Sequence, residues 1–393
     1  MAHHGPIPTD RPSAGDRAAR AAGFIPPGPR PTGPLGRVLV WISSVLVAIP
    51  WICLAWGSLV DLPPWPVIIV LTLLPFVVVS VAAWLFLLWT VLPDAKLLPL
   101  LLVASLGPGL IRWGPIWAAS PDPLSDGGVS LKVMSWNVQR LWQTTEDIDA
   151  ATCVVDAVTQ EAPDVLLLME VTTADLKVLA TGADLTCTHT TYRTRNMPNA
   201  SGMAVCTRGD VWSLGPSRAA TYTPGDDWQY QQTELTSETA EATFFSVHLA
   251  PHRLLHDPVG SWESVRDRAP ATSALQFKQA ASLLKAASET SQPIIAGDFN
   301  SSRDVPLHQL LRASFTDTWE HAAHGLGSTV DVLGILPLRI DFTYASPALQ
   351  ILGADIPDVA CSDHRPVIST LGVPPRTVET QNMTDGRSIM DHP

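Results

Sequence analysis

Polar residues suited to acid–base chemistry or metal binding stand at the ends of short apolar runs in the C-terminal part of this 393-residue chain. Asn137 follows LKVMSW, Glu170 ends VLLLME, His248 follows TFFSV, and Asp298 and Asn300 follow PIIAG. Three more come later along the chain: Asp341, Asp363 and His364. Hydrolysis of a phosphate ester needs an oriented water, neutralised charge on the phosphate oxygens and help for the leaving oxygen. Together these residue types could supply all three.

Each of these residues alone could be an ordinary strand end that reaches solvent, and only their combination favours a catalytic site. Glu170 offers the hard carboxylate oxygen that Mg²⁺ prefers, and Asn137 can position that metal or the phosphate. Asp298 is the candidate general base that orients and deprotonates the attacking water. Asn300 can donate a hydrogen bond to a phosphate oxygen without adding negative charge. No thiol or seryl nucleophile motif stands beside them, so direct attack by water is predicted rather than a covalent intermediate.

The order and local contexts of these residues resemble the endonuclease/exonuclease/phosphatase superfamily, whose fold is like that of DNase I. This superfamily includes secreted deoxyribonucleases, abasic-site endonucleases, bacterial sphingomyelinases and inositol-polyphosphate 5-phosphatases. The segments that carry the resemblance lie between residues 130 and 372: SWNV (135–138), LLLMEV (166–171), SVHLAP (246–251), GDFN (297–300), RIDFTYAS (339–346) and SDHRPV (362–367). GDFN and SDHRP are specific to the superfamily, whereas WN and HL alone are weak signals.

The resemblance implies a role for each remaining residue. His364 and Asp341 resemble the family's catalytic His–Asp pair, in which the carboxylate orients the imidazole and raises its pKa. His248 resembles the second active-site histidine, which binds phosphate or assists the leaving group, and Asp363 is expected to add a metal or water contact. The implied cofactor is Mg²⁺ (or Mn²⁺), with no organic cofactor. The chain departs from the family after Thr329, where an aromatic residue is often found and a valine stands here, so the family does not predict substrate contacts in that region.

The elements that must position these side chains are short apolar strands that alternate with amphipathic helices. Strands are predicted at LKVMSWNV, VLLLMEV, MAVCTR, TFFSVHL, PIIAGDF, RIDFTYA and RPVIST, and helices at 146–161, 172–180, 271–289 and 306–313. Apolar runs bounded by turn residues are typical of strands covered on both faces. We therefore expect a C-terminal α/β domain over 130–372, and the resemblance makes it a four-layer α/β sandwich of the DNase I-like kind.

The N-terminal part has the composition of a membrane anchor. Residues 1–36 are rich in Pro, Gly, Ala and Arg and are predicted to be a disordered tail, as are residues 373–393. Long uncharged runs predict an all-α transmembrane bundle of about three helices over 37–119. The predicted helices cover 38–60, 67–92 and 97–117. Turn-forming residues over 120–129 predict a linker to the α/β domain.

The third predicted helix decides on which side of the membrane the α/β domain lies. Five arginines precede the first helix and none follows it directly, which places the N-terminus in the cytoplasm by the positive-inside rule. Leu97–Ile111 is uncharged but reaches only about 22 Å as a helix, and an extension to Ala119 includes Arg112. Three crossings give a multi-pass cell-membrane protein with an extracytoplasmic α/β domain, whereas two leave that domain in the cytoplasm. We expect three.

Charge and location together bear on the substrate. The first 129 residues contain seven Lys/Arg and six Asp/Glu and the rest contain 18 and 31, so the α/β domain carries a net charge of about −13. This balance disfavours a nucleic-acid binder, which normally has a basic surface. A site outside the membrane and close to the headgroups favours a phospholipid or an isoprenoid-lipid phosphate or pyrophosphate. The layout as a whole is similar to that of bacterial teicoplanin-resistance membrane proteins.

Two alternatives to a lipid-directed phosphoesterase stay open. A surface endonuclease or exonuclease is compatible with the same motifs, although the acidic domain disfavours it. A non-catalytic binding module on a membrane stem would show a broken catalytic set, and every position here holds a competent residue. The expected partners are therefore the lipid bilayer and a phosphorylated, lipid-linked substrate, with nucleic acid less favoured.

Cysteine and tryptophan give weaker signals. The four cysteines of the α/β domain have no metal-binding spacing and are expected to be buried free thiols. They are Cys153, Cys187, Cys206 and Cys361. If the domain lies outside the cell, Cys187 and Cys206 are the pair to expect as a disulfide, because they lie on predicted neighbouring strands. Trp228 is interpreted as a packing residue rather than a platform for stacking bases.

Overall fold

The computed structural model describes residues 33–61, 63–113, 120–141, 149–191, 201–252, 262–332 and 336–376. The chain divides into two units, one of residues 1–48 with 78–106 and one of residues 49–77 with 107–393, and each is considered by itself. The predicted tails lie mostly outside the described residues, so their predicted disorder stays untested. The N-terminal one is shorter than predicted, since a helix begins at Pro34.

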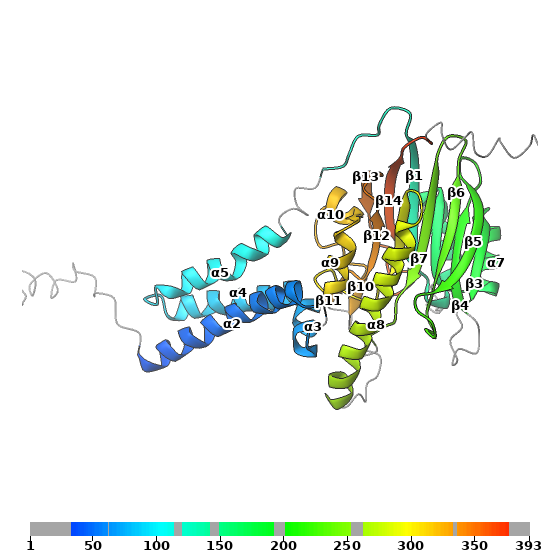
Figure 1. The fold of residues 1–393 in the computed structure, drawn as a ribbon. Helices are drawn as coiled ribbons and strands as arrows, with labels where there is room; N and C mark the ends of the chain where they lie inside the picture. The colour runs from blue at the N-terminus through cyan, green and yellow to red at the C-terminus, as the bar shows by residue number, and fades with distance from the viewer. Residues whose placement is uncertain are drawn as a thin grey trace, which may run out of the picture. The chain divides into compact units, whose positions relative to one another are not determined.

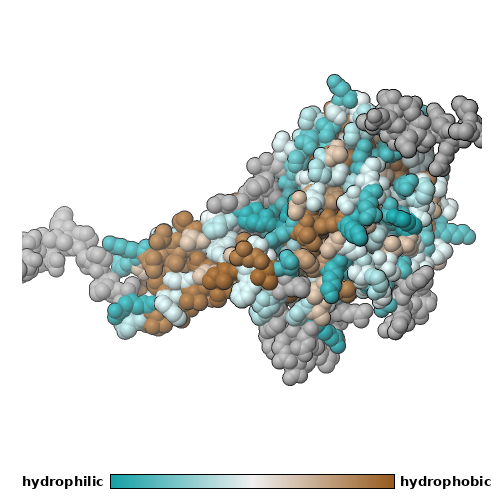
Figure 2. Space-filling view, in the orientation of Figure 1, coloured by the Kyte–Doolittle hydropathy of each residue, from teal (hydrophilic) through white to brown (hydrophobic). Residues whose placement is uncertain are grey.

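Hydrophobic residues cover much of the visible surface of the N-terminal helices (Figure 2). These helices are α2 (Pro34–Leu59), α3 (Trp65–Thr72), α4 (Leu74–Val91) and α5 (Leu97–Trp113). Among the described residues, α2 and α4 are long and apolar enough to cross a membrane, whereas the apolar stretch of α5, Leu97–Leu110, is shorter. Within the first unit, the Trp84 indole of α4 donates to Ser43 Oγ of α2 at 3.2 Å. An N-terminal apolar helical region is therefore present, and the number of spans stays a prediction.

The single helix predicted at 67–92 is interrupted. α3 ends at Thr72 and α4 begins at Leu74, so Leu73 separates them. Pro75 explains the interruption, because proline has no N–H to donate and its ring clashes with the carbonyl four residues earlier, that of Leu71. The helix predicted over this stretch is therefore divided into two at the proline.

The second unit contains two six-stranded sheets. The first has the strand order β13-β14-β1-β2-β4-β3 and the second β5-β6-β7-β8-β12-β9. The strands of the first sheet are β1 (Val129–Asn137), β2 (Val165–Thr172), β3 (Thr186–Thr191), β4 (Ser201–Thr207), β13 (Gln350–Asp355) and β14 (Val367–Val373). Those of the second are β5 (Ser213–Thr221), β6 (Gln229–Thr236), β7 (Glu241–His248), β8 (Pro293–Asp298), β9 (Thr316–Asp317) and β12 (Asp341–Ala345). A separate hairpin joins β10 (Val330–Val332) to β11 (Leu336–Leu338).

The two sheets pack face to face, and helices cover both outer sides (Figure 1). Along β1, Leu131 and Val133 point into the core between the sheets, whereas Met134 and Trp136 point to the outer side. This alternation is what a strand buried on both faces requires. The helices on the side of the first sheet are α6 (Ala150–Glu161) and α7 (Thr173–Gly182), and those on the side of the second are α8 (Trp262–Ser288) and α9 (Pro306–Arg312). The predicted four-layer α/β sandwich is confirmed.

Each sheet has a parallel pair at its centre. β1 runs parallel to β2, and β7 runs parallel to β8. β12 runs antiparallel to β8 with Asp341 opposite Asp298, and β14 runs antiparallel to β1 with Val367 opposite Ser135. The first residues of β12 and β14 therefore lie beside the last residues of β8 and β1.

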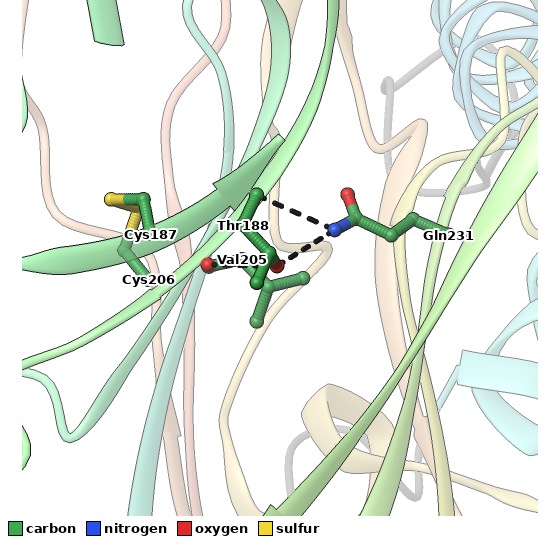
Figure 3. Close-up of a disulfide and its surroundings, with 5 residues drawn as sticks. All are labelled: Cys187, Thr188, Val205, Cys206 and Gln231. Atoms are coloured by element: carbon green, nitrogen blue, oxygen red, sulfur yellow. Dashed lines mark hydrogen bonds between the residues drawn. A yellow bond between two sulfur atoms is a disulfide. The ribbon is translucent and has the colours of Figure 1, made fainter. Parts of the chain in front are cut away.

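The four cysteines of the α/β sandwich form two disulfides, so the expectation of free thiols is wrong. Cys187–Cys206 joins paired residues of β3 and β4, the pair expected for a domain outside the cell (Figure 3). Cys153–Cys361 joins α6 to the segment between β13 and β14, across 208 residues of sequence. Only the fold brings these two thiols together, because no local sequence pattern reports a contact over such a separation.

Candidate active site

Most of the predicted site residues meet at one edge of the sandwich. β1 ends at Asn137, β7 at His248 and β8 at Asp298, while β12 begins at Asp341 and His364 lies just ahead of β14. Open α/β sheets commonly build their sites beyond the ends of parallel strands. Here strand ends from both sheets contribute to one such site.

Asp298 lies at the centre of this group and is 1% exposed. Its Oδ2 accepts a hydrogen bond from Asn137 Nδ2 at 3.0 Å and lies 3.6 Å from His248 Nε2 and 4.0 Å from His364 Nε2. Its Oδ1 accepts a hydrogen bond from the backbone N–H of Asn300 at 2.7 Å. The carboxylate is thus held in one orientation, as a general base must be.

The glycine ahead of Asp298 has a structural cause. Gly297 has a φ of +147°, and a Cβ on it would lie 1.9 Å from the backbone oxygen of Val247 on the neighbouring β7. Such a distance leaves no room for any side chain, so only glycine lets β8 lie beside β7 at this point. The close approach brings the ends of the two strands, Asp298 and His248, into register.

His364 and Asp341 form the predicted pair. His364 Nδ1 donates to Asp341 Oδ2 at 2.8 Å, and the backbone carbonyl of His364 accepts a hydrogen bond from Trp136 Nε1 at 2.9 Å. Burial lowers the pKa of the imidazole, but the charge and hydrogen bond of Asp341 outweigh it and raise the pKa of His364 to about 10. The imidazole is therefore a cation at neutral pH, able to stabilise negative charge on a phosphate.

The same surroundings make Asp298 a stronger base than an ordinary aspartate. Burial and then the negative charge of Asp341 raise the pKa of Asp298 to about 6, although the two nearby histidines oppose this. A general base is most effective when its pKa is close to the working pH. The environment of Asp298 is therefore consistent with proton abstraction from water near neutrality.

The acidic side chains at this edge can hold a divalent metal. Ligand atoms of Asp298, Asp341 and His364 lie within 4.8 Å of one another, and Asp341 Oδ1 is buried with no hydrogen-bond partner among the described residues. A protonated imidazole cannot ligate a metal, because metal binding requires the neutral ring. The donors that remain are oxygens, which fit a hard cation such as Mg²⁺ or Mn²⁺ better than zinc.

Glu170 reaches this edge through an irregularity in β2. The register of β2 against β4 shifts between Met169 and Val171, and Glu170 has a φ of 55°, in the left-handed region that residues other than glycine seldom adopt. Its Oε1 accepts a hydrogen bond from Asn137 Nδ2 at 3.3 Å and lies 3.7 Å from His248 Nε2. Backbone strain of this kind tends to occur at functional sites. The bulge thus turns the side chain of Glu170 toward the edge that holds Asn137 and His248.

Asn300 and Asp363 have contacts that qualify their predicted roles. Asn300 Nδ2 donates to the backbone oxygen of Leu249 at 3.0 Å, which leaves one amide proton for a phosphate. Asp363 is exposed, and its Oδ1 lies 3.3 Å from Ser362 Oγ. Among the hydrogen bonds and ion pairs of the described residues, none joins Asp363 to the other carboxylates. Its metal contact stays a prediction.

Thr329 supports both halves of the His–Asp pair, a role that no sequence signal indicated. Its Oγ1 accepts hydrogen bonds from the backbone N–H groups of Ile340 at 3.1 Å and Asp341 at 3.2 Å. Its carbonyl oxygen accepts a hydrogen bond from the backbone N–H of Arg365 at 2.7 Å. Thr329 thus fixes the start of β12 and the residue after His364 at the same time.

Trp228 packs as predicted, but its packing partner is a site residue. Its ring meets the ring of His248 edge to face, with centroids 5.2 Å apart at 76°. The turn that carries it is anchored, because Asp226 Oδ1 accepts the Trp228 N–H at 3.0 Å and Asp226 Oδ2 accepts Gln279 Nε2 of α8 at 3.0 Å. Gln279 Oε1 in turn accepts the N–H of Ala250 at 3.2 Å. One network therefore fixes Trp228 and the chain just after His248.

Comparison with known proteins identifies the fold and the family signature. The model of the endonuclease/exonuclease/phosphatase family matches residues 134–364. Solved structures with the same fold include a functionally unknown conserved protein from Enterococcus faecalis, with 15% identity, a TM-score of 0.50 and coverage of 61% of this chain and 99% of that chain. Another is an endonuclease/exonuclease/phosphatase from Bacteroides vulgatus, with 14% identity, a TM-score of 0.50 and coverage of 62% and 99%. No curated protein matches significantly. At such identities the likeness to these structures concerns the fold alone.

Proposed function

Because the chain belongs to the endonuclease/exonuclease/phosphatase family and is a hydrolase of phosphate ester bonds, we propose that it is a membrane-anchored, metal-dependent phosphoesterase acting on a lipid-linked phosphate outside the cell. The observation that carries the catalytic part is one buried group. In it, Asp298 faces His248 and His364 at 3.6 and 4.0 Å, beside the carboxylates of Glu170 and Asp341.

The side chains divide the work of hydrolysis between them. Asp298 orients the attacking water and accepts its proton, while Asn137 keeps the carboxylate in position through the 3.0 Å hydrogen bond to Oδ2. His364, kept a cation by Asp341, stabilises the charge that develops on the phosphate. His248 binds the phosphate or assists the leaving oxygen. A divalent cation held by Glu170, with Asn137 and Asp363 as further contacts, would neutralise charge on the phosphate oxygens.

Membrane anchoring is supported by apolar side chains on the surface of the N-terminal helices. Trp41 of α2 is 69% exposed, Val79 of α4 is 62% exposed and Val103 of α5 is 66% exposed. Side chains of this kind are unfavourable in water and favourable in a bilayer core. An enzyme anchored by such helices works close to lipid headgroups, which supports a lipid-linked substrate.

An extracytoplasmic location is supported by the two disulfides. Disulfides persist in oxidising compartments and are rare in the reducing cytosol. Cys153–Cys361 and Cys187–Cys206 use all the cysteines of the α/β sandwich, and Cys53 of α2 is the free one among the described residues. This pattern agrees with three membrane crossings and an N-terminus in the cytoplasm, the arrangement that we propose.

The test is a substrate panel with the full-length protein purified in detergent, assayed with Mg²⁺. The panel contains an isoprenoid-lipid monophosphate, the corresponding pyrophosphate, a glycerophospholipid, a sphingomyelin-type diester and plasmid DNA. We expect hydrolysis of at least one lipid substrate and no cleavage of DNA, with the Asp298→Asn protein as the control for contaminating activity. Cleavage of DNA alone would replace the proposal with a surface nuclease. Hydrolysis of none of these substrates would contradict the lipid-directed proposal.

A further inference from the structure

The backbone segment that carries His364 has little regular structure of its own. It comprises residues 356–366 between β13 and β14, where the backbone pairing is limited to an isolated bridge between His364 and Val330. A catalytic side chain on such a segment depends on contacts from outside it for its position. Cys361 lies in this segment, three residues ahead of His364.

Cys361 is fixed to the body of the sandwich in two ways. Its side chain is fully buried and belongs to the apolar cluster that contains Trp136, Val138 and Val154. It is also bonded to Cys153, in the first turns of α6. That helix is anchored by its own buried side chains and by the cap that Asp149 forms with the N–H of Ala151 at 3.2 Å. The disulfide therefore ties an irregular segment to a rigid element.

The residue after Cys361 transmits this anchoring to the site. Ser362 Oγ donates to the backbone oxygen of Asn137 at 2.8 Å and accepts the backbone N–H of His364 at 3.3 Å. A shift of Cys361 would move Ser362, and with it two backbone contacts that hold Asn137 and His364. Trp136 and Asp341 hold His364 itself through hydrogen bonds. The disulfide holds Cys361, three residues earlier, which neither of these contacts reaches.

We propose that the Cys153–Cys361 disulfide positions the imidazole of His364 for catalysis, so that turnover depends on this bond. Both cysteines are positioning residues, because neither touches the reacting atoms. The inference rests on the catalytic role proposed for His364. It goes beyond that role by making the oxidised state of one particular disulfide a condition for full activity.

The other disulfide provides a matched control. Cys206 of β4 lies opposite Leu166 in β2, four residues before Glu170 in the chain. Next to Cys187 lies Thr188, whose Oγ1 accepts Gln231 Nε2 of β6 at 2.9 Å, a contact between the two sheets (Figure 3). In each disulfide one cysteine is fully buried (Cys206 or Cys361) and the other is partly exposed (Cys187 or Cys153). Replacing the partly exposed cysteine therefore breaks either bond while the buried one still fills its place in the core.

The experiment compares Cys153→Ser with Cys187→Ser in full-length protein in detergent, both on a Cys53→Ala background. Turnover of bis-p-nitrophenyl phosphate with Mg²⁺ is measured at a temperature where circular dichroism shows both proteins folded. We expect Cys153→Ser to lower kcat at least about tenfold with KM within about twofold, since small misplacements of a catalytic group have large effects on rate. Cys187→Ser should keep both constants within about twofold. Retained kcat in Cys153→Ser, or an equal loss in Cys187→Ser, overturns the inference.

A second measurement tests the inference even if the Cys153→Ser protein does not fold. The Cys187→Ser/Cys206→Ser protein keeps only the Cys153–Cys361 bond, which is opened with dithiothreitol and closed again by oxidation, with mass spectrometry reporting its state. Activity should fall and return with this bond. Activity that persists with both thiols free overturns the inference.

Hydrogen exchange separates this inference from the proposed function. The peptide covering 356–366 should exchange faster in Cys153→Ser than in Cys187→Ser, whether or not the protein turns over any substrate. Unchanged exchange there overturns the positioning role even in an active enzyme. A protein that hydrolyses no phosphoester but shows the faster exchange contradicts the proposed function instead.

Discussion

Asp341 accepts a hydrogen bond from His364 Nδ1 at 2.8 Å and lies opposite Asp298 in the pairing of β12 with β8. One carboxylate therefore acts on both titrating groups of the site. It raises the pKa of His364 by attraction to the imidazolium, and it adds to the effect of burial in raising the pKa of Asp298. The acid and the base of the proposed mechanism are thus tuned by the same side chain.

The pH dependence of turnover should report this tuning. Activity requires ionised Asp298 and protonated His364, so kcat should rise through about pH 6 and fall through about pH 10. Asp341→Asn removes the negative charge that raises both pKa values, so both limbs should move to lower pH. The measurement is kcat from about pH 5 to about pH 11 for both proteins. An alkaline limb that stays in place would show that Asp341 does not set the pKa of His364.

Stability should depend on pH with a defined sign. The pKa of His364 is about 10 in the folded state, above its ordinary value of 6.5, so the folded state binds the proton more tightly. This contribution is fully present below about pH 6.5 and is lost as the pH rises through about 10. The Tm of the native protein should therefore fall between pH 7 and pH 10, and the Tm of Asp341→Asn should fall less. A native Tm that is flat over this range would be inconsistent with a buried imidazolium.

Loss of the general base should separate catalysis from stability. Asp298→Asn should lower kcat at least about 10²-fold, the usual size of a lost general base. Its Tm should be unchanged or higher, because the amide removes a buried charge that lies near Asp341. Asp210→Asn, at an exposed position, is the control for the same chemical change. Near-native turnover of Asp298→Asn would assign the role of base to another residue.

Metal removal should abolish activity, and Glu170 should set the affinity for the metal. Turnover should cease in EDTA and return with Mg²⁺ or Mn²⁺. Glu170→Gln should raise the Mg²⁺ concentration needed for half-maximal activity at least about tenfold, on the scale of a lost contact to a metal site. Glu238→Gln, at an exposed position, should leave this Mg²⁺ concentration unchanged. Full turnover after exhaustive chelation would eliminate the metal-dependent mechanism.

Trp228 should act through His248. Trp228→Ala removes the ring that packs against the imidazole and should lower kcat about tenfold. Trp228→Phe keeps an aromatic ring and should retain most of the native kcat. Hydrogen exchange in β7 shows whether the alanine variant is also unfolded locally. Equal activity of the two variants would mean that the ring contact has no part in turnover.

Membrane topology can be tested with a thiol reagent that does not cross membranes. On a Cys53→Ala background, a cysteine introduced at Ser388 should react in intact cells. One introduced at Ser13 should react only after lysis. The physical basis is the five arginines ahead of the first helix, followed by three crossings. A Ser388 probe that is protected until lysis would place the catalytic domain in the cytoplasm and remove the argument for an extracytoplasmic substrate.

Strands with an apolar pattern could be predicted from the sequence, and those without one could not. β2 and β8 are continuous apolar runs, and both were expected. β6 has the sequence QYQQTELT, yet Gln231 and Thr233 are fully buried. The Gln231 amide is hydrogen-bonded to Thr188 of the facing sheet, and the Thr233 hydroxyl to Ser217 of β5. β5 contains Gly215 and Pro216 and lies at the edge of its sheet, where the apolar pattern is weakest. Burial that depends on a partner in another sheet leaves no local signal.

The sequence alone determined which side chains are candidates to carry the chemistry and that apolar helices precede the domain. It did so because the site residues stand at strand ends, where the apolar pattern stops and a polar residue appears. The tertiary structure decided what holds those side chains in place. Three contacts of this kind join segments that are distant along the chain. They are the hydrogen bond from the Asp341 N–H to Thr329, the ring contact of Trp228 with His248, and the Cys153–Cys361 disulfide. Such contacts arise when whole layers pack together, so they cannot be predicted from any short stretch of sequence.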